Sequence, residues 1–300
     1  MEKGSFAQEF LAGNVGGLAG IVLVYPLDTA KIRMQVNPGY TSIMSVMRNL
    51  TQAHGFSALY RGLPSPALGF GLVFAISFSG YGHGCRMISE HKGIGMSKLS
   101  LTDLALAGAY TGGLQSPFRQ VMERVKSVMQ VREGTAMRAA YSWTGSCAVQ
   151  LVKEEGWRNG LFRGYWSVLL REVPQFAVYY PSYEYSKSTL TKHVPQYPLL
   201  VQLLSGGIAG LVQWMPPIYY ADIIKSRMQV ALPGQYSSVW DCAKKVWNEP
   251  GGGLRAYHRG FGVALLRSFP LHATVFLGYE MAMKMTGDLF VSTGRSLDIG

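Results

Sequence analysis

Long stretches without a charged residue run through the chain. Residues 10–27, 62–85 and 196–221 contain no Asp, Glu, Lys or Arg and are 18, 24 and 26 residues long. A helix of roughly 20 residues crosses a bilayer core of about 30 Å, so all three are predicted to span a membrane. Uncharged runs of this length are rare in the helices of soluble folds.

Three further segments have weaker patterns. Residues 104–118 are uncharged but only 15 residues long, and residues 165–187 and 261–283 are apolar with charges inside them. The embedded charges include Arg171 and Glu172 in the first, and Arg267 and Glu280 in the second. A plain hydropathy profile would miss these segments, but the internal repeat described next predicts that they span as well.

An acid, a lysine and a glutamine recur along the chain. Asp28, Lys31 and Gln35 are followed by an equivalent set 95 positions later and by another after 99 more. The later sets are Glu123, Lys126 and Gln130, and Asp222, Lys225 and Gln229. Such a fixed period is typical of tandem structural units.

Two more markers follow each set in constant order. The first is a three-residue motif, an aromatic residue or His followed by Arg and Gly, whose glycines are Gly62, Gly164 and Gly260. The second is a tyrosine near the end of each unit, at Tyr81, Tyr183 and Tyr279. Between each acid–lysine–glutamine set and the three-residue motif, amphipathic stretches open at Tyr40, Tyr141 and Tyr236 and are predicted to be short helices at the membrane interface. We therefore predict three repeats, residues 1–98, 99–195 and 196–300. Together they form an all-α membrane protein with six transmembrane helices, three short helices and pseudo-threefold symmetry.

Composition agrees with a lipid-embedded chain. Apolar residues make up 48% of the 300 residues and charged residues 15%, against about 25% in soluble domains. The net charge of +11 suits cationic ends that touch anionic lipid, and because Lys and Arg form no stripe, no nucleic-acid partner is expected. Three scattered cysteines exclude a disulfide scaffold. No metal site, cofactor or nucleophile–base pair is apparent, so an enzyme is not expected.

These markers resemble the mitochondrial carrier family over essentially the whole chain. The family signature, Pro-x-Asp/Glu-x-x-Lys/Arg-x-Lys/Arg, is complete from Pro26 to Arg33, and the third repeat keeps its acid and both bases. The resemblance implies a monomeric carrier of the mitochondrial inner membrane with both termini towards the intermembrane space. It also implies cardiolipin bound at the Arg61-Gly62, Arg163-Gly164 and Arg259-Gly260 elements.

The acid and lysine of each set lie three residues apart, so they share one helix face with the glutamine that follows. A solvated pair on a single helix is the simpler interpretation. Threefold symmetry favours another, in which each lysine reaches the acid of the neighbouring repeat and the ring closes the cavity on one side. Gln35, Gln130 and Gln229 are then expected to add hydrogen bonds beneath. The resemblance implies that this ring is the matrix-side gate.

The third repeat departs from the pattern. Val121 and Tyr220 stand where the first repeat has Pro26, and Pro216 and Pro217 lie upstream in the third. Gly206 to Asp222 is also one residue longer than the corresponding Gly13 to Asp28. One extra residue near the bend is expected, as a π-bulge.

The resemblance places a second gate at the cytoplasmic ends of the even-numbered helices, which are the second, fourth and sixth of the six predicted transmembrane helices. Its sequence pattern is aromatic-acid-x-x-base. Tyr183, Glu184 and Lys187 satisfy this pattern. Tyr81 is followed by Gly82 rather than an acid, and Tyr279-Glu280 lacks the base. A single acid–base pair therefore predicts an easily opened outer gate.

Charges in the middle of a membrane are expensive and by default mark function. With the even-numbered helices aligned on their closing tyrosines, Arg171 matches Gly69 and Arg267, and Glu172 matches Phe70 and Ser268. The resemblance makes these the substrate contact points. Arg171 and Glu172 are neighbours that point about 100° apart, so they are not expected to pair with each other.

Two arginines and one carboxylate suit a zwitterion, with Arg171 and Arg267 on its carboxylate and Glu172 on its cation. Trp214 either offers a cation–π face or packs as an anchor. Within the family the motifs are most similar to the carnitine/acylcarnitine and basic amino-acid carriers. The apolar side around Gly69 and Phe70 favours carnitine or acylcarnitine exchange. A basic amino-acid carrier and a transport-inactive scaffold remain as alternatives.

Overall fold

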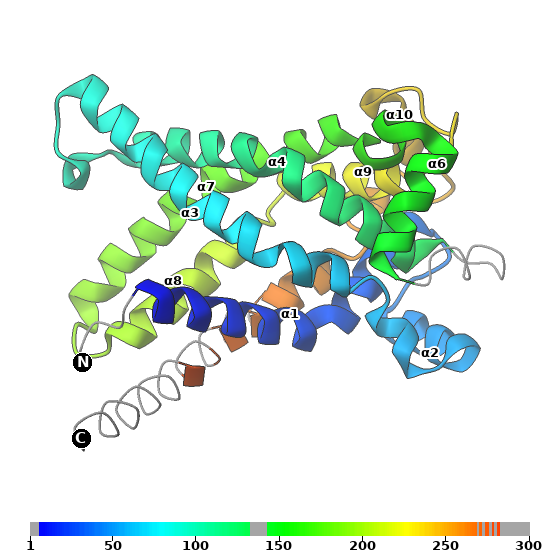
Figure 1. Cartoon of the computed structure of the whole chain (residues 1–300), viewed down its shortest axis with the longest axis horizontal. Helices are drawn as coiled ribbons and strands as arrows, with labels where there is room; N and C mark the ends of the chain where they lie inside the picture. The colour runs from blue at the N-terminus through cyan, green and yellow to red at the C-terminus, as the bar shows by residue number, and fades with distance from the viewer. Residues whose placement is uncertain are drawn as a thin grey trace, which may run out of the picture.

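The computed structural model describes residues 6–132, 143–268, 270–271, 274–275, 278 and 281–282. Long helices, without a strand among these residues, run side by side through the molecule (Figure 1). They are α1 (Phe6–Val36), α3 (Pro64–Lys92), α4 (Leu101–Val131), α7 (Tyr165–His193), the successive helices α8 (Pro198–Val212) and α9 (Ile218–Val230), and helical residues 261–268. The predicted all-helical architecture is confirmed.

Short helices gather at one end of the long ones, on the right of Figure 1. They are α2 (Ile43–His54), α6 (Thr144–Phe162) and α10 (Val239–Asn248), with the single turns η1 (Phe56–Tyr60), η2 (Met96–Lys98) and α11 (Leu254–Tyr257) elsewhere along the chain. The side chains of Ser42 and Ser238 cap α2 and α10 by accepting from the backbone N–H three residues on. The expected opening of the middle short helix at Tyr141 lies outside the described residues.

Polarity is inverted relative to a soluble protein. Gln115, Gln120, Arg124 and Glu172 are completely buried. Large apolar side chains cover the outside instead, including Leu68 at 77% and Trp166 at 70% exposure. Monomeric soluble proteins rarely expose apolar surface on this scale, so the outer face is suited to lipid.

Length and apolarity alone identify few of the spans. Two helical stretches, Gly13–Val36 and Phe56–Lys92, are long and apolar enough to cross a membrane, and Leu200–Val212 is a shorter apolar helix. In α7 the charges that lower the hydropathy are turned inward, since Arg171 and Glu172 are 3% and 0% exposed. Hydropathy averages over all faces of a helix, so it misses a span whose charges face the interior.

The three marker glycines have a shared structural cause. Gly62, Gly164 and Gly260 have φ values of 79°, 81° and 75°, a left-handed conformation that L-residues rarely adopt. Each also lies close to the following repeat in cyclic order. A Cβ on Gly62 would be 3.0 Å from the Lys126 carbonyl oxygen, and one on Gly260 would be 3.4 Å from the Lys31 carbonyl oxygen. The repeats therefore interlock in a ring.

Small residues also bring α4 and α7 into close contact. A Cβ on Gly112 would lie 2.5 Å from the Glu172 carbonyl oxygen, and one on Gly108 would clash with the carbonyl of Phe176. Both contacts are with backbone atoms that cannot rotate away. Glycine at these two positions thus sets the distance between the two helices.

The third repeat does not contain the expected π-bulge. α8 ends at Val212 and α9 begins at Ile218, and residues 213–217 form turns between them. Proline lacks the N–H that a continuous helix needs, so Pro216 and Pro217 break the helix rather than widen one turn of it. The peptide bond between these two prolines is cis.

Candidate functional site

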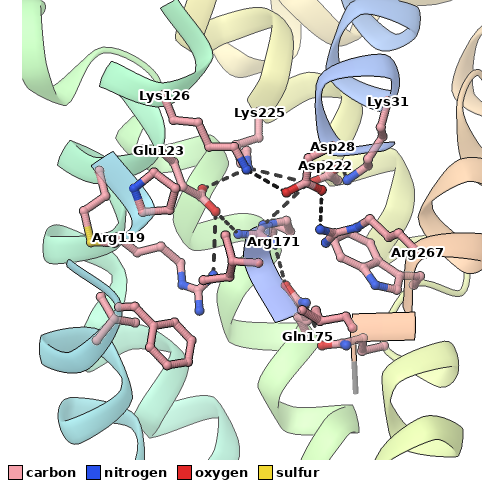
Figure 2. A pocket seen from close by; sticks show the side chains of 18 of the residues that line it. Asp28, Lys31, Arg119, Glu123, Lys126, Arg171, Gln175, Asp222, Lys225 and Arg267 are labelled. Atoms are coloured by element: carbon pink, nitrogen blue, oxygen red, sulfur yellow. Dashed lines mark hydrogen bonds and ion pairs between the residues drawn. The ribbon is translucent and has the colours of Figure 1, made fainter. Parts of the chain in front are cut away.

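The three acid–lysine sets meet where α1, α4 and α9 approach the short helices, and each lysine reaches a neighbouring repeat (Figure 2). The Nζ-to-carboxylate distances are 2.8 Å for Lys126–Asp28, 2.8 Å for Lys225–Glu123 and 2.6 Å for Lys31–Asp222. Within one helix, Lys225 lies 3.6 Å from Asp222, farther than from its partner in the next repeat. The regular spacing along the sequence thus becomes a closed ring of ion pairs in space.

The glutamines connect the repeats in a different way from that expected. Gln35 donates to the Asp222 carboxylate at 2.7 Å and so supports one ion pair. Gln130 donates to the Thr29 hydroxyl at 2.9 Å, and Gln229 donates to Gln120 at 3.2 Å. Among the described residues, hydrogen bonds from a glutamine to the ring therefore occur only at Gln35. The other two glutamines bond to uncharged side chains of a neighbouring repeat instead of to its ring acid.

Arg171 lies at the centre of the site (Figure 2). Its Nη2 is 3.0 Å from the Glu123 carboxylate, its Nε is 3.8 Å from Asp222, and its Nη1 donates to Gln175 at 2.8 Å. It also forms an ion pair with Glu172, so the prediction that these neighbours do not pair is wrong. The long arginine side chain folds back along α7 and overcomes the divergence of the two Cβ directions.

Arg267 reaches the ring as well. It pairs with Asp28, and its guanidinium lies 5.2 Å from the centre of the Trp214 ring. Trp214 is 4% exposed and carries Lys31 Nζ at 4.1 Å over the same ring. Both predicted contact arginines are therefore bonded to acids of the ring, and the face of Trp214 is covered by the cations of the chain itself.

Arg119 also belongs to the site, although it is not among the residues predicted from the sequence. It projects from α4 one turn before Glu123, with Nη1 3.7 Å from Glu123 and Nε 3.2 Å from Glu172. Glu172 is fully buried and also accepts from Gln115 at 2.9 Å, so it does not face the cavity as a free acid. The signal was present, because Arg119 directly follows the uncharged run that ends at residue 118.

A cavity of about 450 Å³ extends from the ring along the long helices. Its polar lining comprises the ring residues and three arginines, Arg119, Arg171 and Arg267. Its apolar lining includes Ile21, Phe70, Val73, Phe74, Phe78, Leu271 and Val275.

The two substrate-contact residues predicted on α3, Gly69 and Phe70, have different positions relative to the cavity. Phe70 lines the cavity, and its ring packs against Gly17. A Cβ on Gly17 would clash with this ring. Gly69 does not line the cavity, because the Met122 side chain covers it. The prediction of Gly69 as a contact position is corrected accordingly, since a helix turns by about 100° per residue and Phe70 takes the inward direction.

At the opposite end, Tyr81 of α3 stacks on Tyr180 of α7, with ring centroids 3.7 Å apart and planes at 7°. Lys187 lies 5.6 Å from the centre of the Tyr183 ring. Where the chain is described, no ion pair joins Glu184 to Lys187, contrary to the pair that the pattern suggested. The lysine turns to the aromatic face one helical turn away instead. The remaining members predicted for this gate, Tyr279 and Glu280, lie outside the described residues.

The marker arginines have protein partners. Arg163 lies 3.2 Å from the Glu155 carboxylate, and Arg259 pairs with Glu249. The backbone at each of these elements accepts a hydrogen bond from the long helix that comes before it in the same repeat, which is α1, α4 or α9. Tyr25 and Tyr219 donate to the carbonyls of Arg61 and Arg259 at 2.9 and 2.7 Å, and Gln120 donates to that of Arg163 at 3.0 Å. In the described part of the chain, no cluster of three or more His, Cys, Asp or Glu is placed to hold a metal ion.

Comparison with known proteins agrees with this architecture. The sequence profile of the family described as mitochondrial carrier protein matches residues 2–92, 97–194 and 195–289. The mitochondrial carnitine/acylcarnitine carrier protein of Macaca fascicularis is 33% identical over 294 residues, covering 92% of this chain and 93% of that protein. The mitochondrial basic amino acids transporter of Bos taurus is 35% identical over 282 residues, covering 90% and 89%.

A third relative is the mitochondrial arginine transporter of Arabidopsis thaliana, 31% identical over 283 residues and covering 93% of this chain and 92% of that protein. The resemblance inferred from the repeated motifs is thus confirmed across all three repeats. The chain belongs to the mitochondrial carrier family.

Proposed function

We propose that this protein exchanges a zwitterionic, amino-acid-like metabolite, carnitine and its acyl esters, across the mitochondrial inner membrane. It works as a monomer by alternating access. The observation that carries the proposal is the mixed lining of the cavity, which combines three arginines with a row of phenylalanines on α3. An acylcarnitine combines a carboxylate, a quaternary ammonium group and an aliphatic chain, and the cavity offers a complementary surface to each.

The carboxylate is bound by Arg171 and Arg267. Both guanidinium groups already hold carboxylates of the protein, Glu123 and Asp28. An incoming carboxylate that takes over Arg267 releases it from Asp28, which removes an ion pair between the third repeat and the first. Substrate binding at the arginines thereby favours opening of the ring, which couples transport to occupancy through differential binding of the two states.

The acyl chain lies on the wall formed by α3. Phe70, Phe74 and Phe78 follow each other at one-turn spacing, with ring centroids 5.4 and 4.5 Å apart. The ammonium group is placed against aromatic faces, with Phe74 and Tyr179 both lining the cavity. Glu172 is not assigned this role, because it is buried beneath Arg119 and accepts from Gln115.

The charge balance of the site supports a zwitterion over a basic amino acid. Six cations meet four acids in the described part of the site, so two positive charges are in excess. The cations are Lys31, Lys126, Lys225, Arg119, Arg171 and Arg267, and the acids are Asp28, Glu123, Asp222 and Glu172. Every one of the acids is already paired, whereas the second ammonium of ornithine, lysine or arginine needs an acid of its own.

The remaining assignments complete the proposal. The ion-pair ring is the matrix gate, and Tyr81, Tyr183, Glu184, Lys187, Tyr279 and Glu280 contribute to the cytoplasmic gate. Both termini face the intermembrane space. The Arg61-Gly62, Arg163-Gly164 and Arg259-Gly260 elements hold cardiolipin through backbone N–H groups at the starts of the following helices, because two of these arginine side chains are paired with acids.

The test is exchange in proteoliposomes loaded with unlabelled substrate. We expect uptake of labelled carnitine and of a labelled acylcarnitine, and little uptake of ornithine or arginine. Arg171→Gln and Arg267→Gln are expected to abolish uptake while thermal unfolding shows folded protein. Exchange of ornithine or arginine without carnitine would make the protein a basic amino-acid carrier. A folded protein that exchanges none of these solutes would support the scaffold alternative.

A further inference from the structure

Arg119 breaks the threefold pattern of the cavity. The equivalent positions, 95 residues earlier and 99 later, are Val24 and Ile218, which are 2% and 7% exposed. The gate residues are repeated in every unit, but a metabolite has no threefold symmetry. Residues that distinguish one metabolite from another are therefore expected among those that the repeats do not share.

Its surroundings place Arg119 on the cavity wall and not in the gate. The side chain is 29% exposed, lines the cavity, and lies 6.0 Å from the centre of the Phe176 ring (Figure 2). It contacts both Glu123 and Glu172. Each of these acids has a second cation, because Arg171 reaches both of them. Arg119 is thus an additional charge over acids that are already neutralised, and it provides one of the two excess positive charges.

We propose that Arg119 is a specificity-determining residue that keeps dicationic substrates out of the cavity. It covers the two acids that a second ammonium group would otherwise approach, and it repels that group directly. This inference rests on the proposed function, because it explains how a carnitine-type site rejects basic amino acids. It adds a role that neither the gate nor the contact arginines supply.

The size of the effect follows from Coulomb's law. A unit charge about 6 Å from another, at an effective dielectric constant of about 20, changes affinity on the order of a hundredfold. Water in the cavity screens part of this interaction, so about tenfold is the smallest change that we expect.

The experiment compares full-length carriers in proteoliposomes. The measured quantity is the ratio of two initial uptake rates, that of labelled ornithine to that of labelled carnitine. Each is measured in vesicles loaded with the unlabelled form of the solute whose uptake is followed. Arg119→Gln is expected to raise this ratio at least about tenfold, and Arg119→Lys to keep it within about threefold of the wild-type value. Arg86→Gln removes the same charge from an exposed position that does not line the cavity, and is expected to leave the ratio unchanged.

A second variant and a leak measurement keep the outcomes distinct. Arg119→Met keeps a long side chain without its charge, so it replaces Arg119→Gln if that variant does not fold. Entry of labelled sucrose measures a general leak of the vesicles. A carnitine-selective wild type whose ratio does not change in either neutral variant overturns the role of Arg119 alone. A wild type that takes up ornithine as fast as carnitine overturns the proposed substrate class itself. A rise in sucrose entry together with ornithine entry would assign the change to a damaged gate and also refute the proposal.

Discussion

The pair of Lys31 and Asp222 offers a quantitative test of the ion-pair ring. Its two side chains are 9% and 1% exposed, and the charged atoms are 2.6 Å apart. Lys31→Gln removes the cation but leaves Asp222 with Lys225 at 3.6 Å and Arg171 at 3.8 Å. Asp222→Asn leaves Lys31 buried against Trp214, and among the described residues no other acid is paired with it.

These contacts set the expected magnitudes. Removing one partner of a buried pair costs about 3–5 kcal/mol. Because Asp222 keeps other cations, we expect about 3 kcal/mol for Lys31→Gln, and about 4 kcal/mol for Asp222→Asn, which strands a lysine. In the double variant neither charge is left unpaired, so the loss is about 5 kcal/mol and the coupling energy about 2 kcal/mol.

The assay is thermal unfolding of the purified carriers in lipid–detergent, where 1 kcal/mol corresponds to about 2 °C for a chain of this size. The control cycle uses Lys245 and Asp241, which lie 2.9 Å apart on α10 with side chains 54% and 27% exposed. That pair is expected to couple by about 0.5 kcal/mol or less. Additive effects at Lys31 and Asp222, within about 0.5 kcal/mol, would refute the reasoning that the ring lysines and acids depend on one another.

Two further predictions concern packing and thiol chemistry. Gly112→Ala places a Cβ 2.5 Å from the Glu172 carbonyl oxygen and is expected to destabilise the carrier by about 1–3 kcal/mol, whereas Gly113→Ala, with nothing within 4 Å, leaves unfolding unchanged or raises its temperature. An equal loss in both variants would contradict the close contact of α4 and α7. Burial raises the pKa of the Cys147 and Cys242 thiols to about 12, so maleimide is expected to label them in native carrier at pH 7.4 far more slowly than in denatured carrier. Equal labelling rates would show that α6 and α10, which carry these cysteines, are not packed as described.

The symmetric part of the molecule could be predicted because the same motifs occur three times in the sequence at nearly constant spacing. The spacing from Asp28 to Glu123 to Asp222 fixes three helices with the same face inward, and a threefold axis then leaves little freedom for the lysines. The marker glycines are predictable for the same reason. Each needs a left-handed backbone and sits against the next repeat, so the same requirement recurs in every unit.

The asymmetric part could not be predicted in this way. Whether a side chain on one turn points into the cavity or against a neighbour depends on rotation of the helix by a fraction of a turn. Gly69 and Phe70 are adjacent, yet only Phe70 lines the cavity. Glu172 was expected to be available to a ligand, but Gln115 and Arg119, from a different helix, bury it. The break after Val212 depends on two successive prolines that no other repeat contains.

The most direct test of the central claim is a distance across the proposed gate before and after substrate is added. Arg227 of α9 donates to the Gln35 carbonyl at 2.8 Å, so the ends of α1 and α9 lie together in this state. Spin labels at Asn37→Cys and Leu232→Cys, both exposed and just beyond these ends, report their separation by pulsed electron paramagnetic resonance. We predict a single short distance without substrate and a second, longer population with carnitine. An unchanged distribution, in a labelled carrier that still exchanges carnitine, would contradict the account.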